Sequence, residues 1–481
     1  LVVLFELAMI TVVVADDLFV LLVGWEVMGI CSYLLIGHHW ELPAAREGAV
    51  KAFVMTRLGD LGLLIGIFVL GGTFGTFSIS TILDRIGRGA EPGQLTAAGL
   101  LLLCAVVGKS AQFPLHTWLP DAMPGPTPIS ALIHAATMVA AGVYLVARLY
   151  PVFAASAVTM TALAVIACVS MLLAALFALA QSDLKRVLAW STVSQLAYMF
   201  AALAVGGSDA GIAHLLSHGS FKALLFLAAG CVAHAVGSTT LTSMGGLRTA
   251  MPVTFVTATI GFAALAGVVP TSGFLTKDAV LSSAVHATQH PAPVAAATAW
   301  LVLLVGLLTA VVTVVYSTRT WLLVFFGTRE PRAQMHESPV AMTGPLVALA
   351  VATLALGATQ SWHPALGVLT TLIAVGGVAG TVAYWRRGRD PAELLGASRD
   401  LFARELGVDG AYDGLAAGVG RTGDFTVAAD TDVIDAYPRG TAVVAVTGSR
   451  LLDRLQTGNV QTYAVVFGAG ALLVVLAVVA W

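Results

Sequence analysis

Apolar runs of about 20 residues follow one another along most of this chain and limit the folds open to it. Only helices or closed β-barrels cross lipid, because hydrocarbon offers backbone N–H and C=O groups no partner. The runs lack the alternation of apolar and polar residues that a barrel strand needs. The chain is 58% hydrophobic and 10% charged over 481 residues, against about 25% charged residues in soluble domains. An all-α, polytopic membrane protein is therefore predicted.

The apolar runs predict thirteen transmembrane spans. They cover about 1–15, 17–38, 49–71, 96–120, 127–148, 157–180, 187–206, 210–236, 252–284, 295–326, 340–358, 365–385 and 460–481. The first is a partial span, because the chain opens on LVVLFELAMI, without a Met or a charged leader. We expect part of the natural N-terminus to be missing.

Basic residues in alternate loops predict the orientation of the spans. One set of loops holds Arg46, Lys185, Arg186, Arg248, Arg329, Arg332, Arg386, Arg387 and Arg389. The other set holds little besides Arg85, Arg88 and Arg148. Because cytoplasmic loops are enriched in Lys and Arg, the first set is predicted to be cytoplasmic and the C-terminus to face outside.

The remaining composition narrows the function. A net charge of −2 gives no indication of nucleic-acid binding. The four cysteines lie in apolar runs without a C-x-x-C pair, which argues against a disulfide framework or a metal site. The chain has no Rossmann fingerprint and no haem motif, so no cofactor is expected in it.

Two five-span blocks divide most of the chain, residues 1–148 and 157–326. In each block the fourth span contains a proline beside polar residues, Pro114 in 96–120 and Pro270 in 252–284. Paired broken helices in corresponding halves of a transporter indicate its ion path. We predict two inverted five-helix repeats with two discontinuous helices, followed by two additional spans in 340–385.

The segment 386–459 is too charged to span a membrane, and 460–481 follows it as a last anchoring span. Two interpretations of 386–459 stand. As a helix it would reach up to about 110 Å, which suits an amphipathic helix along the membrane surface. As a loose cytoplasmic loop it would explain the seven glycines between 410 and 448.

Lysine usage is the sharpest functional signal. Only five of the 24 basic residues are lysines, and Lys109, Lys222 and Lys277 lie inside predicted spans or at a break. A desolvated lysine can lose its proton, whereas an arginine stays charged, so buried lysines suit a proton conductor. Lys109 lies about 20 Å along its span, too deep for easy contact with water.

Two carboxylates are candidate partners for Lys109. Glu26 lies near the middle of its own span, and opposite buried charges are cheapest side by side, so Glu26–Lys109 is the predicted pair. Arg57 and Asp60 share one helix face at i,i+3. They form either a local salt bridge or, through Asp60, a further partner for the first pair.

Histidines continue the set of titratable groups. His214, His218 and Lys222 recur at i, i+4 and i+8, within about 80° of one another on one helix face. A metal site would need a third ligand that the spacing does not supply. His134 stands alone in its span, either as an interhelical hydrogen-bonding residue or as a relay.

Two further groups lie at helix ends. Lys277 and Asp278 follow the break at Pro270 in a layout like that around Lys109. Asp183 precedes Lys185 and Arg186 at a span end, where membrane anchoring is the simpler interpretation.

Several long motifs resemble a known family: GWEVMGICSYLLIG, KAFVMTRLGDLGL, VVGKSAQFPLHTWLPDAMPGPTPISALIHAATMVAAGVYL, DLKRVLAWSTVSQLAYM, HLLSHGSFKALLFL and GFLTKDAVL. They resemble the antiporter-like membrane subunits of respiratory complex I (NADH:quinone oxidoreductase), most of all the L-type subunits. Mrp-type Na⁺/H⁺ antiporters and membrane-bound hydrogenases share this core. The resemblance covers nearly the whole chain. It implies a sixteen-helix subunit lacking its first three helices, with a lateral amphipathic helix in 386–459, in the bacterial plasma membrane.

The resemblance also implies roles for individual residues. Glu26 and Lys109 resemble the charge pair of the first half-channel, with Arg57 and Asp60 as an accessory pair. His134 resembles a link toward a central axis that continues through His214, His218 and Lys222. Lys277, with Asp278 beside it, resembles the terminal lysine of the second half-channel, and Asp183 is a further accessory residue.

The expected function is proton translocation through these residues, coupled to redox chemistry in partner subunits. FMN, iron–sulfur clusters and quinone are expected in those partners, and the lateral helix is expected to contact adjacent antiporter-like subunits and lipid. One alternative is a subunit of an Mrp-type Na⁺/H⁺ antiporter, against which the lysines at both breaks argue, since Na⁺ prefers oxygen ligands. A third interpretation is a scaffold whose long helix clamps its neighbours.

Overall fold

The computed structural model describes residues 1–89, 92–135, 137–328, 336–357 and 364–481. Arg329 and Arg332, assigned above to a cytoplasmic loop, lie outside the described residues. The chain divides into two units, Leu1–Leu406 and Gly407–Trp481. Within the described residues the secondary structure is helical, and the only β-structure there is a pair of isolated bridges.

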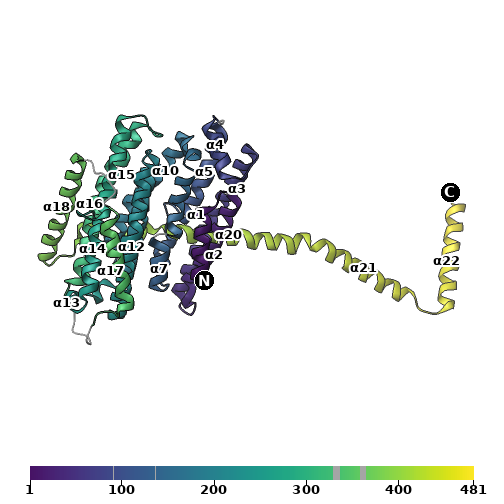
Figure 1. Cartoon of the computed structure of the whole chain (residues 1–481). Helices are drawn as coiled ribbons and strands as arrows, with labels where there is room; N and C mark the ends of the chain where they lie inside the picture. The colour runs from purple at the N-terminus through teal and green to yellow at the C-terminus, as the bar shows by residue number, and fades with distance from the viewer. Residues whose placement is uncertain (90–91, 136, 329–335, 358–363) are drawn as a thin grey trace. The chain divides into compact units, whose positions relative to one another are not determined.

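Figure 1 shows the helices of the first unit packed side by side. Its first part contains α1 (Val2–Val14), α2 (Leu18–Ile36), α3 (Pro43–Phe74), α4 (Ile79–Gly87), α5 (Pro92–Lys109), α6 (Trp118–Asp121), α7 (Thr127–Ala135), α8 (Ala141–Arg148) and α9 (Tyr150–Ala154). Its second part contains α10 (Ala157–Ala180), α11 (Leu184–Ala204), α12 (Ser208–Val236), α13 (Leu247–Ala250), α14 (Pro252–Ala266), α15 (Ser272–Gln289), α16 (Ala296–Phe325), α17 (Val340–Ala355) and α18 (Pro364–Arg386).

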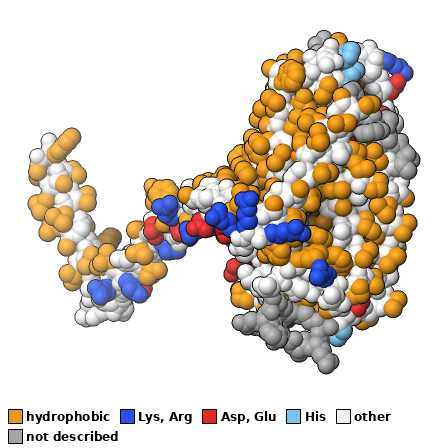
Figure 2. Space-filling view, turned by 90° about the vertical axis from the view of Figure 1, so that its left-hand side faces the viewer, with side chains coloured by type: hydrophobic (Ala, Val, Ile, Leu, Met, Phe, Trp, Pro, Cys, Tyr) orange, Lys and Arg blue, Asp and Glu red, His pale blue; other side chains and the backbone are white. Residues whose placement is uncertain are grey.

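The predicted all-α membrane fold is confirmed. By length and composition, nine helices within the described ranges are apolar enough to cross a membrane. Four shorter apolar helices accompany them, Val2–Val14, Leu95–Lys109, Pro252–Ala266 and Val340–Ala355. Exposed side chains of α3 such as Leu61, Ile65 and Phe68 are apolar, and apolar side chains cover much of the face in Figure 2. Such a surface suits hydrocarbon, where apolar residues need no cover from water.

Both predicted helix breaks are present. Helix α5 ends at Lys109, and regular helix resumes only at α6. Pro114 has no N–H to donate, and side chains bond the backbone groups freed there. Trp118 Nε1 donates to the carbonyl of Gly108 at 3.0 Å, and Phe113 N–H donates to Ser170 Oγ at 2.9 Å. In the second half, α14 ends at Ala266, and Gly267 follows it with a φ of +76°, which suits glycine.

A third interruption differs from the prediction of an unbroken span over 127–148. Helix α7 ends at Ala135, and a short 3₁₀ turn, Met138–Ala140, leads into α8. Thr137 has a non-helical backbone (φ −120°, ψ −104°). Its hydroxyl donates to the carbonyl of Leu132 at 2.6 Å, in competition with the regular helical pattern. No proline marks this break, so the apolar pattern did not indicate it.

Each half has an aspartate that caps the start of a long helix and also forms an isolated β-bridge. Asp17 accepts hydrogen bonds from backbone N–H groups at the start of α2, and Asp183 accepts one at the start of α11. Each aspartate also forms an isolated antiparallel bridge, Asp17 with Ser78 and Asp183 with Thr240. In both halves the bridge ties this start to the chain just beyond the next long helix, α3 or α12.

The second unit is described by itself. It contains α20 (Val408–Ala429), a π-helical turn (Asp430–Ile434), α21 (Ala436–Leu455) and α22 (Val460–Val479). The structure is thus helical over most of the segment for which a loose loop was the alternative. The long helix begins only at Val408, after a 3₁₀ helix (Pro391–Ser398) and the short helix α19 (Arg399–Ala403). Its lateral position on the membrane stays a prediction.

The segment after α18 is fastened to the first unit by charge. Asp390 contacts Arg319 of α16 through two oxygens, with Nε–Oδ1 2.5 Å and Nη2–Oδ2 2.9 Å. Arg319 is 2% exposed and also donates to the carbonyl of Gln181 at 2.8 Å. Burial opposes ionisation of Asp390, but the hydrogen bonds and charge of Arg319 outweigh it and hold its pKa below the usual value.

We expect Asp390→Asn to destabilise the first unit by about 2 kcal/mol, since it leaves a buried guanidinium short of its acceptor. The folded-state pKa of Asp390 is lowered, so its contribution is complete above the unfolded-state pKa of about 3.9. That contribution is lost as the pH falls through the lower folded-state value. Thermal unfolding of the purified protein between neutral and acidic pH measures both effects. Asp435→Asn, which removes an exposed pair with Arg439, is the control and should cost nearly nothing.

Candidate functional site

A buried ion pair lies at the first helix break. Lys109, the last residue of α5, is 0% exposed, and its Nζ lies 3.2 Å from Asp60 Oδ2 of α3. The other Asp60 oxygen accepts a hydrogen bond from Trp25 Nε1 at 2.6 Å. The Lys109 ammonium also lies 5.4 Å from the centre of the Trp25 ring, within range of a cation–π interaction. Asp60 and Trp25 therefore hold the lysine between them.

The predicted ion pair between Glu26 and Lys109 is wrong, because the two side chains pair with other residues. Glu26 of α2 forms its ion pair with Arg57 of α3, and the acid bonded to Lys109 is Asp60. Both Glu26 and Arg57 are partly exposed, at 24% and 36% of their side chains. Glu26 and Lys109 lie at a similar depth in their spans, but depth does not determine which carboxylate faces the lysine. On α3, Arg57 pairs with Glu26 and Asp60 pairs with Lys109.

Glycines allow these charges to approach. A Cβ on Gly29 would lie 2.8 Å from Lys109 Nζ, and one on Gly59 would lie 2.8 Å from the carbonyl oxygen of Cys104. On Gly62 it would lie 2.5 Å from the carbonyl oxygen of Leu101. Small residues thus bring α3 close to α5, as is usual between membrane helices.

We expect Gly29→Ala to lower both the activity and the stability of the protein. The new methyl group meets the flexible end of Lys109, which moves away and weakens its buried contact with Asp60. Activity and thermal unfolding of the same preparation measure the two effects. Gly72→Ala is the control, since a Cβ there meets nothing within 4 Å. Equal activity in both variants would contradict the importance of the Lys109–Asp60 distance.

His134 links the two halves. It lies on α7, is 1% exposed, and stacks on Phe226 of α12 with ring centres 5.0 Å apart. The carbonyl of the next residue, Ala135, lies 3.1 Å from His218 Nδ1 of α12. The sequence alone left open whether His134 is a lone hydrogen-bonding residue. Its position places it beside the histidine stripe of the second half.

The stripe on α12 contacts three neighbouring helices. His214 Nδ1 lies 2.8 Å from Thr276 Oγ1 of α15, and His214 Nε2 lies 3.3 Å from Gln195 Oε1 of α11. The rings of His214 and His218 are 6.4 Å apart. Lys222 donates to the carbonyl of Leu188 at 3.1 Å and to the hydroxyl of Ser191 on α11. All three stripe residues are buried.

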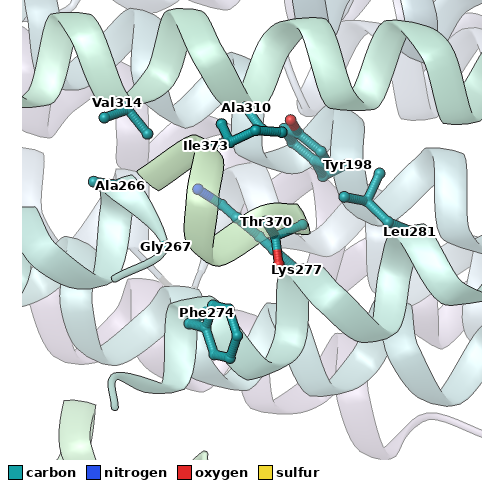
Figure 3. A pocket seen from close by; sticks show the side chains of 10 residues that line it. All are labelled: Tyr198, Ala266, Gly267, Phe274, Lys277, Leu281, Ala310, Val314, Thr370 and Ile373. Atoms are coloured by element: carbon teal, nitrogen blue, oxygen red, sulfur yellow. The ribbon is translucent and has the colours of Figure 1, made fainter. Parts of the chain in front are cut away.

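Lys277 lies in the second turn of α15, close to the second break. Its Nζ donates to the carbonyl of Leu265, one of those left free where α14 ends, and lies 5.8 Å from the centre of the Tyr198 ring. It borders a cavity of about 20 Å³, room for about one water molecule. Figure 3 shows Lys277 among the residues that line it, including Thr370 of α18. Asp278, the next residue, is buried.

A chain of charges lies at the far end of the first broken helix. Asp121 contacts Lys51 of α3 at 2.6 Å and Arg186 of α11 at 3.0 Å. Arg186 also contacts Glu405 at 2.7 Å, and Trp190 Nε1 donates to the same carboxylate at 3.2 Å. Glu405 is 3% exposed although it lies at the end of the first unit.

This chain of charges corrects the anchoring interpretation of 183–186. Lys185 is buried and donates to the carbonyls of Met123 and Gly125 at 3.2 and 3.0 Å, and Arg186 is paired with two carboxylates. Asp183 caps α11 and accepts a hydrogen bond from Thr239. These residues therefore hold protein elements together.

Sequence reasoning missed four residues of the site, Trp25, Asp121, Ser191 and Glu405. Trp25 and Asp121 lie inside motifs already singled out, and a charge at the end of a broken helix was a usable signal. Ser191 lies eight residues after the Asp183 cap on the buried helix α11, where nothing in a single sequence separates it from other serines. Glu405 lies about 220 residues from Arg186, so no local pattern joins them.

The family model described as "NADH:quinone oxidoreductase/Mrp antiporter, TM" matches residues 15–313. The NADH-quinone oxidoreductase subunit L of Mycobacterium tuberculosis is 39% identical, over 98% of this chain and 79% of that protein. The F(420)H(2) dehydrogenase subunit L of Methanosarcina mazei is 36% identical, over 99% of this chain and 81% of that protein.

Solved structures share the fold. The Mrp complex from Dietzia sp. DQ12-45-1b matches with a TM-score of 0.77 and 29% identity, over 93% of this chain. This chain spans about half, 51%, of the matched Mrp chain. An archaeal membrane-bound sulfane sulfur reductase matches with a TM-score of 0.65 and 27% identity, over 79% of this chain and 76% of that one.

Proposed function

Because the chain belongs to the NADH:quinone oxidoreductase/Mrp antiporter family, we propose that it is a proton-translocating membrane subunit of a quinone oxidoreductase complex. Relatives over nearly its whole length are named as L or chain 5 subunits of such enzymes. Redox chemistry on FMN, iron–sulfur clusters and quinone belongs, in this proposal, to partner subunits. Neighbouring membrane subunits and lipid surround the chain in the bacterial plasma membrane.

The observation that carries the proposal is the fully buried Lys109–Asp60 pair at a helix break. An ion pair taken out of water gains little stability over apolar residues, so stability alone is a weak reason for one to lie inside a membrane. A lysine can also give up its proton when its surroundings change, as an arginine cannot. The pair is therefore suited to load and release a proton.

The geometry suggests how Lys109 releases its proton. While Asp60 lies 3.2 Å from Lys109, its negative charge stabilises the protonated lysine. A movement of α3 against α5 that separates them favours the neutral amine, which gives up its proton. Arg57 lies one turn before Asp60 on α3 and is paired with Glu26 of α2, and this second pair sets the field in which that exchange occurs.

The released proton has a chain of acceptors in this proposal. His134 lies beside α12, where His218 and His214 follow, and Thr276 joins His214 to the helix that bears Lys277. Lys222, on the same helix as the histidines, is a further titratable group. Lys277 beside its cavity is the terminal group, with Asp278 next to it and Asp183 as an accessory residue that holds α11 in place.

The two inverted repeats are part of the same proposal. The shared aspartate device at the starts of α2 and α11 supports them. In the first half Trp25, eight residues after Asp17, bonds Asp60, which lies 18 residues before Ser78. In the second half Ser191, eight residues after Asp183, bonds Lys222, which lies 18 residues before Thr240. Corresponding positions thus hold bonded pairs, with an acid in one half and a base in the other.

Sodium transport is the alternative function, since an Mrp complex shares the fold. Nothing in the described path offers a cage of oxygen ligands, and its buried cations would repel Na⁺. The test is NADH-driven acidification of inverted membrane vesicles in sodium-free potassium buffer, read with a pH-sensitive dye. We expect acidification at the same rate with and without added Na⁺. A strict requirement for Na⁺ would favour the alternative.

A further inference from the structure

Helix α18 leads into a short basic segment that the proposed proton path does not use. This segment, residues 386–406, contains the 3₁₀ helix Pro391–Ser398 and α19. It is far richer in charge than the chain as a whole, in which 10% of the residues are charged. Its arginines are Arg386, Arg387, Arg389, Arg399 and Arg404, and its acids are Asp390, Glu393, Asp400 and Glu405. The partners of these charges decide what the segment can bind.

Two of the acids face the first unit and are neutralised by its helices. Asp390 contacts the buried Arg319 of α16, and Glu405 contacts Arg186 of α11 at 2.7 Å. Arg399 lies 3.6 Å from the same Asp390 carboxylate. The negative charge of these two acids is therefore used mainly by arginines outside the segment. Only the other two acids remain for the segment's own arginines.

The backbone at the end of the segment is strained, and the strain accompanies the inward position of Glu405. Glu405 and Leu406 have φ of +58° and +59°, a left-handed conformation that is costly for residues other than glycine. Gly407 continues it at +70°, where glycine avoids that cost. A strained conformation persists only where the surrounding contacts fix it, and here the ion pair of Glu405 with Arg186 does so. The segment is thus folded with this acid buried.

Four of the arginines lie on the outside without an acid. Arg386, Arg387, Arg389 and Arg404 are exposed. Within the described ranges none of the four forms an ion pair. The Arg389 guanidinium lies instead over the ring of Tyr384, 6.0 Å from its centre. Because two acids of the segment are neutralised from inside, its outer face carries more positive than negative charge and favours an anionic partner.

The surroundings of these arginines are those of a membrane boundary. Helix α18 has 23 residues and rises about 34 Å, slightly more than the hydrocarbon core of about 30 Å. Its last turn contains Tyr384 and Trp385, residue types that gather where hydrocarbon meets headgroups. Leu394 and Leu401 are 56% and 52% exposed within the basic segment. Figure 2 shows basic side chains among apolar ones on the face that α18 borders. Such a mixture suits phosphate and acyl chain together.

We propose that the segment 386–406 is a binding surface for anionic phospholipid. Its four outward arginines donate hydrogen bonds to headgroup phosphates, whose oxygens match the planar guanidinium, and its exposed leucines lie against the acyl chains. A zwitterionic headgroup brings an ammonium among the arginines and is held less well. An acidic protein surface would satisfy the arginines, but it would leave exposed leucines directly after a membrane span without a use. The inference goes beyond the proposed function, since such a surface holds lipid whichever ion the chain moves.

Photoactivatable phospholipids test the surface in the intact complex. The complex is placed in phosphatidylcholine vesicles that contain a small, equal amount of a phosphatidylglycerol or a phosphatidylcholine probe, and mass spectrometry identifies the labelled peptides. We expect the anionic probe to label peptides of 386–406 several-fold more than the zwitterionic probe. High salt should reduce this difference, because it screens the charges. Arg386→Gln with Arg387→Gln should bring the two probes close to equal labelling.

Arg88→Gln with Arg439→Gln is the matched control. It removes the same charge from arginines that already have an acid partner, Asp84 and Asp435, and should label like the wild type. Equal labelling by the two probes in the wild type would overturn the anionic surface. An unlabelled segment would overturn it too and would favour an acidic protein as the occupant. Labelling of the wild type decides the matter even where a variant fails to assemble, and it leaves the proposed function standing either way.

Discussion

Asp60→Asn will cost this protein about 3–5 kcal/mol, because it leaves the buried Lys109 ammonium without its carboxylate. The lysine then lacks the carboxylate that holds its ammonium at the end of α5. We expect a lower thermal unfolding temperature of the assembled complex and a lower yield of protons per electron. Both are measured on the same membrane preparation.

Glu26→Gln is the matched control for that substitution. It removes a carboxylate at a similar depth, but one that faces the partly exposed Arg57. Arg57 is not fully enclosed by protein, so its long side chain can turn toward a polar environment, and the stability loss should be smaller than for Asp60→Asn. A larger loss of stability for Glu26→Gln would mean that Glu26 is the true partner of Lys109 and would overturn the pairing described here.

Lys222→Arg should stop proton transfer as completely as Lys222→Met. Arginine keeps the positive charge but does not release its proton in proteins. A positioned acid–base group contributes roughly 10²–10⁴-fold to the rate of a proton transfer, and we expect both variants to lose at least about tenfold in proton flux through this chain. Proton release by vesicles that contain the intact complex measures that flux.

The comparison of these two variants separates charge from titration. If Lys222 serves only as a fixed positive charge held by Ser191 and Leu188, Lys222→Arg will pump normally and Lys222→Met will not. Because Lys222 is fully buried, the larger guanidinium can disturb packing. The amount of assembled complex on native gels must therefore match the wild type before the fluxes are compared.

The membrane fold was predictable from the sequence because lipid leaves the backbone few choices. Apolar length located the spans, and prolines beside polar residues located the breaks after Lys109 and Gly267. The break at Thr137 lacked such a signal. There a threonine hydroxyl bonds the carbonyl of Leu132, five residues back, and nothing in the apolar pattern indicates that contact.

The sequence allowed us to predict which residues belong to the site, but not which of them contact one another. Lysines and histidines inside apolar runs stood out by composition. Depth along a span, however, says nothing about the direction in which a side chain points, so Glu26 and Asp60 were indistinguishable as partners of Lys109. The glycines that bring α3 against α5 held the missing information, since small residues spaced three or four apart favour close helix contact.

The measurement that tests the central claim most directly is the number of protons moved per electron by the intact complex with Lys109→Met. Methionine fills the space of the lysine chain without a titratable group. We expect NADH oxidation to continue with a proton yield lower by the share that this chain moves. A normal rate of NADH oxidation with a normal proton yield would contradict a proton path through Lys109.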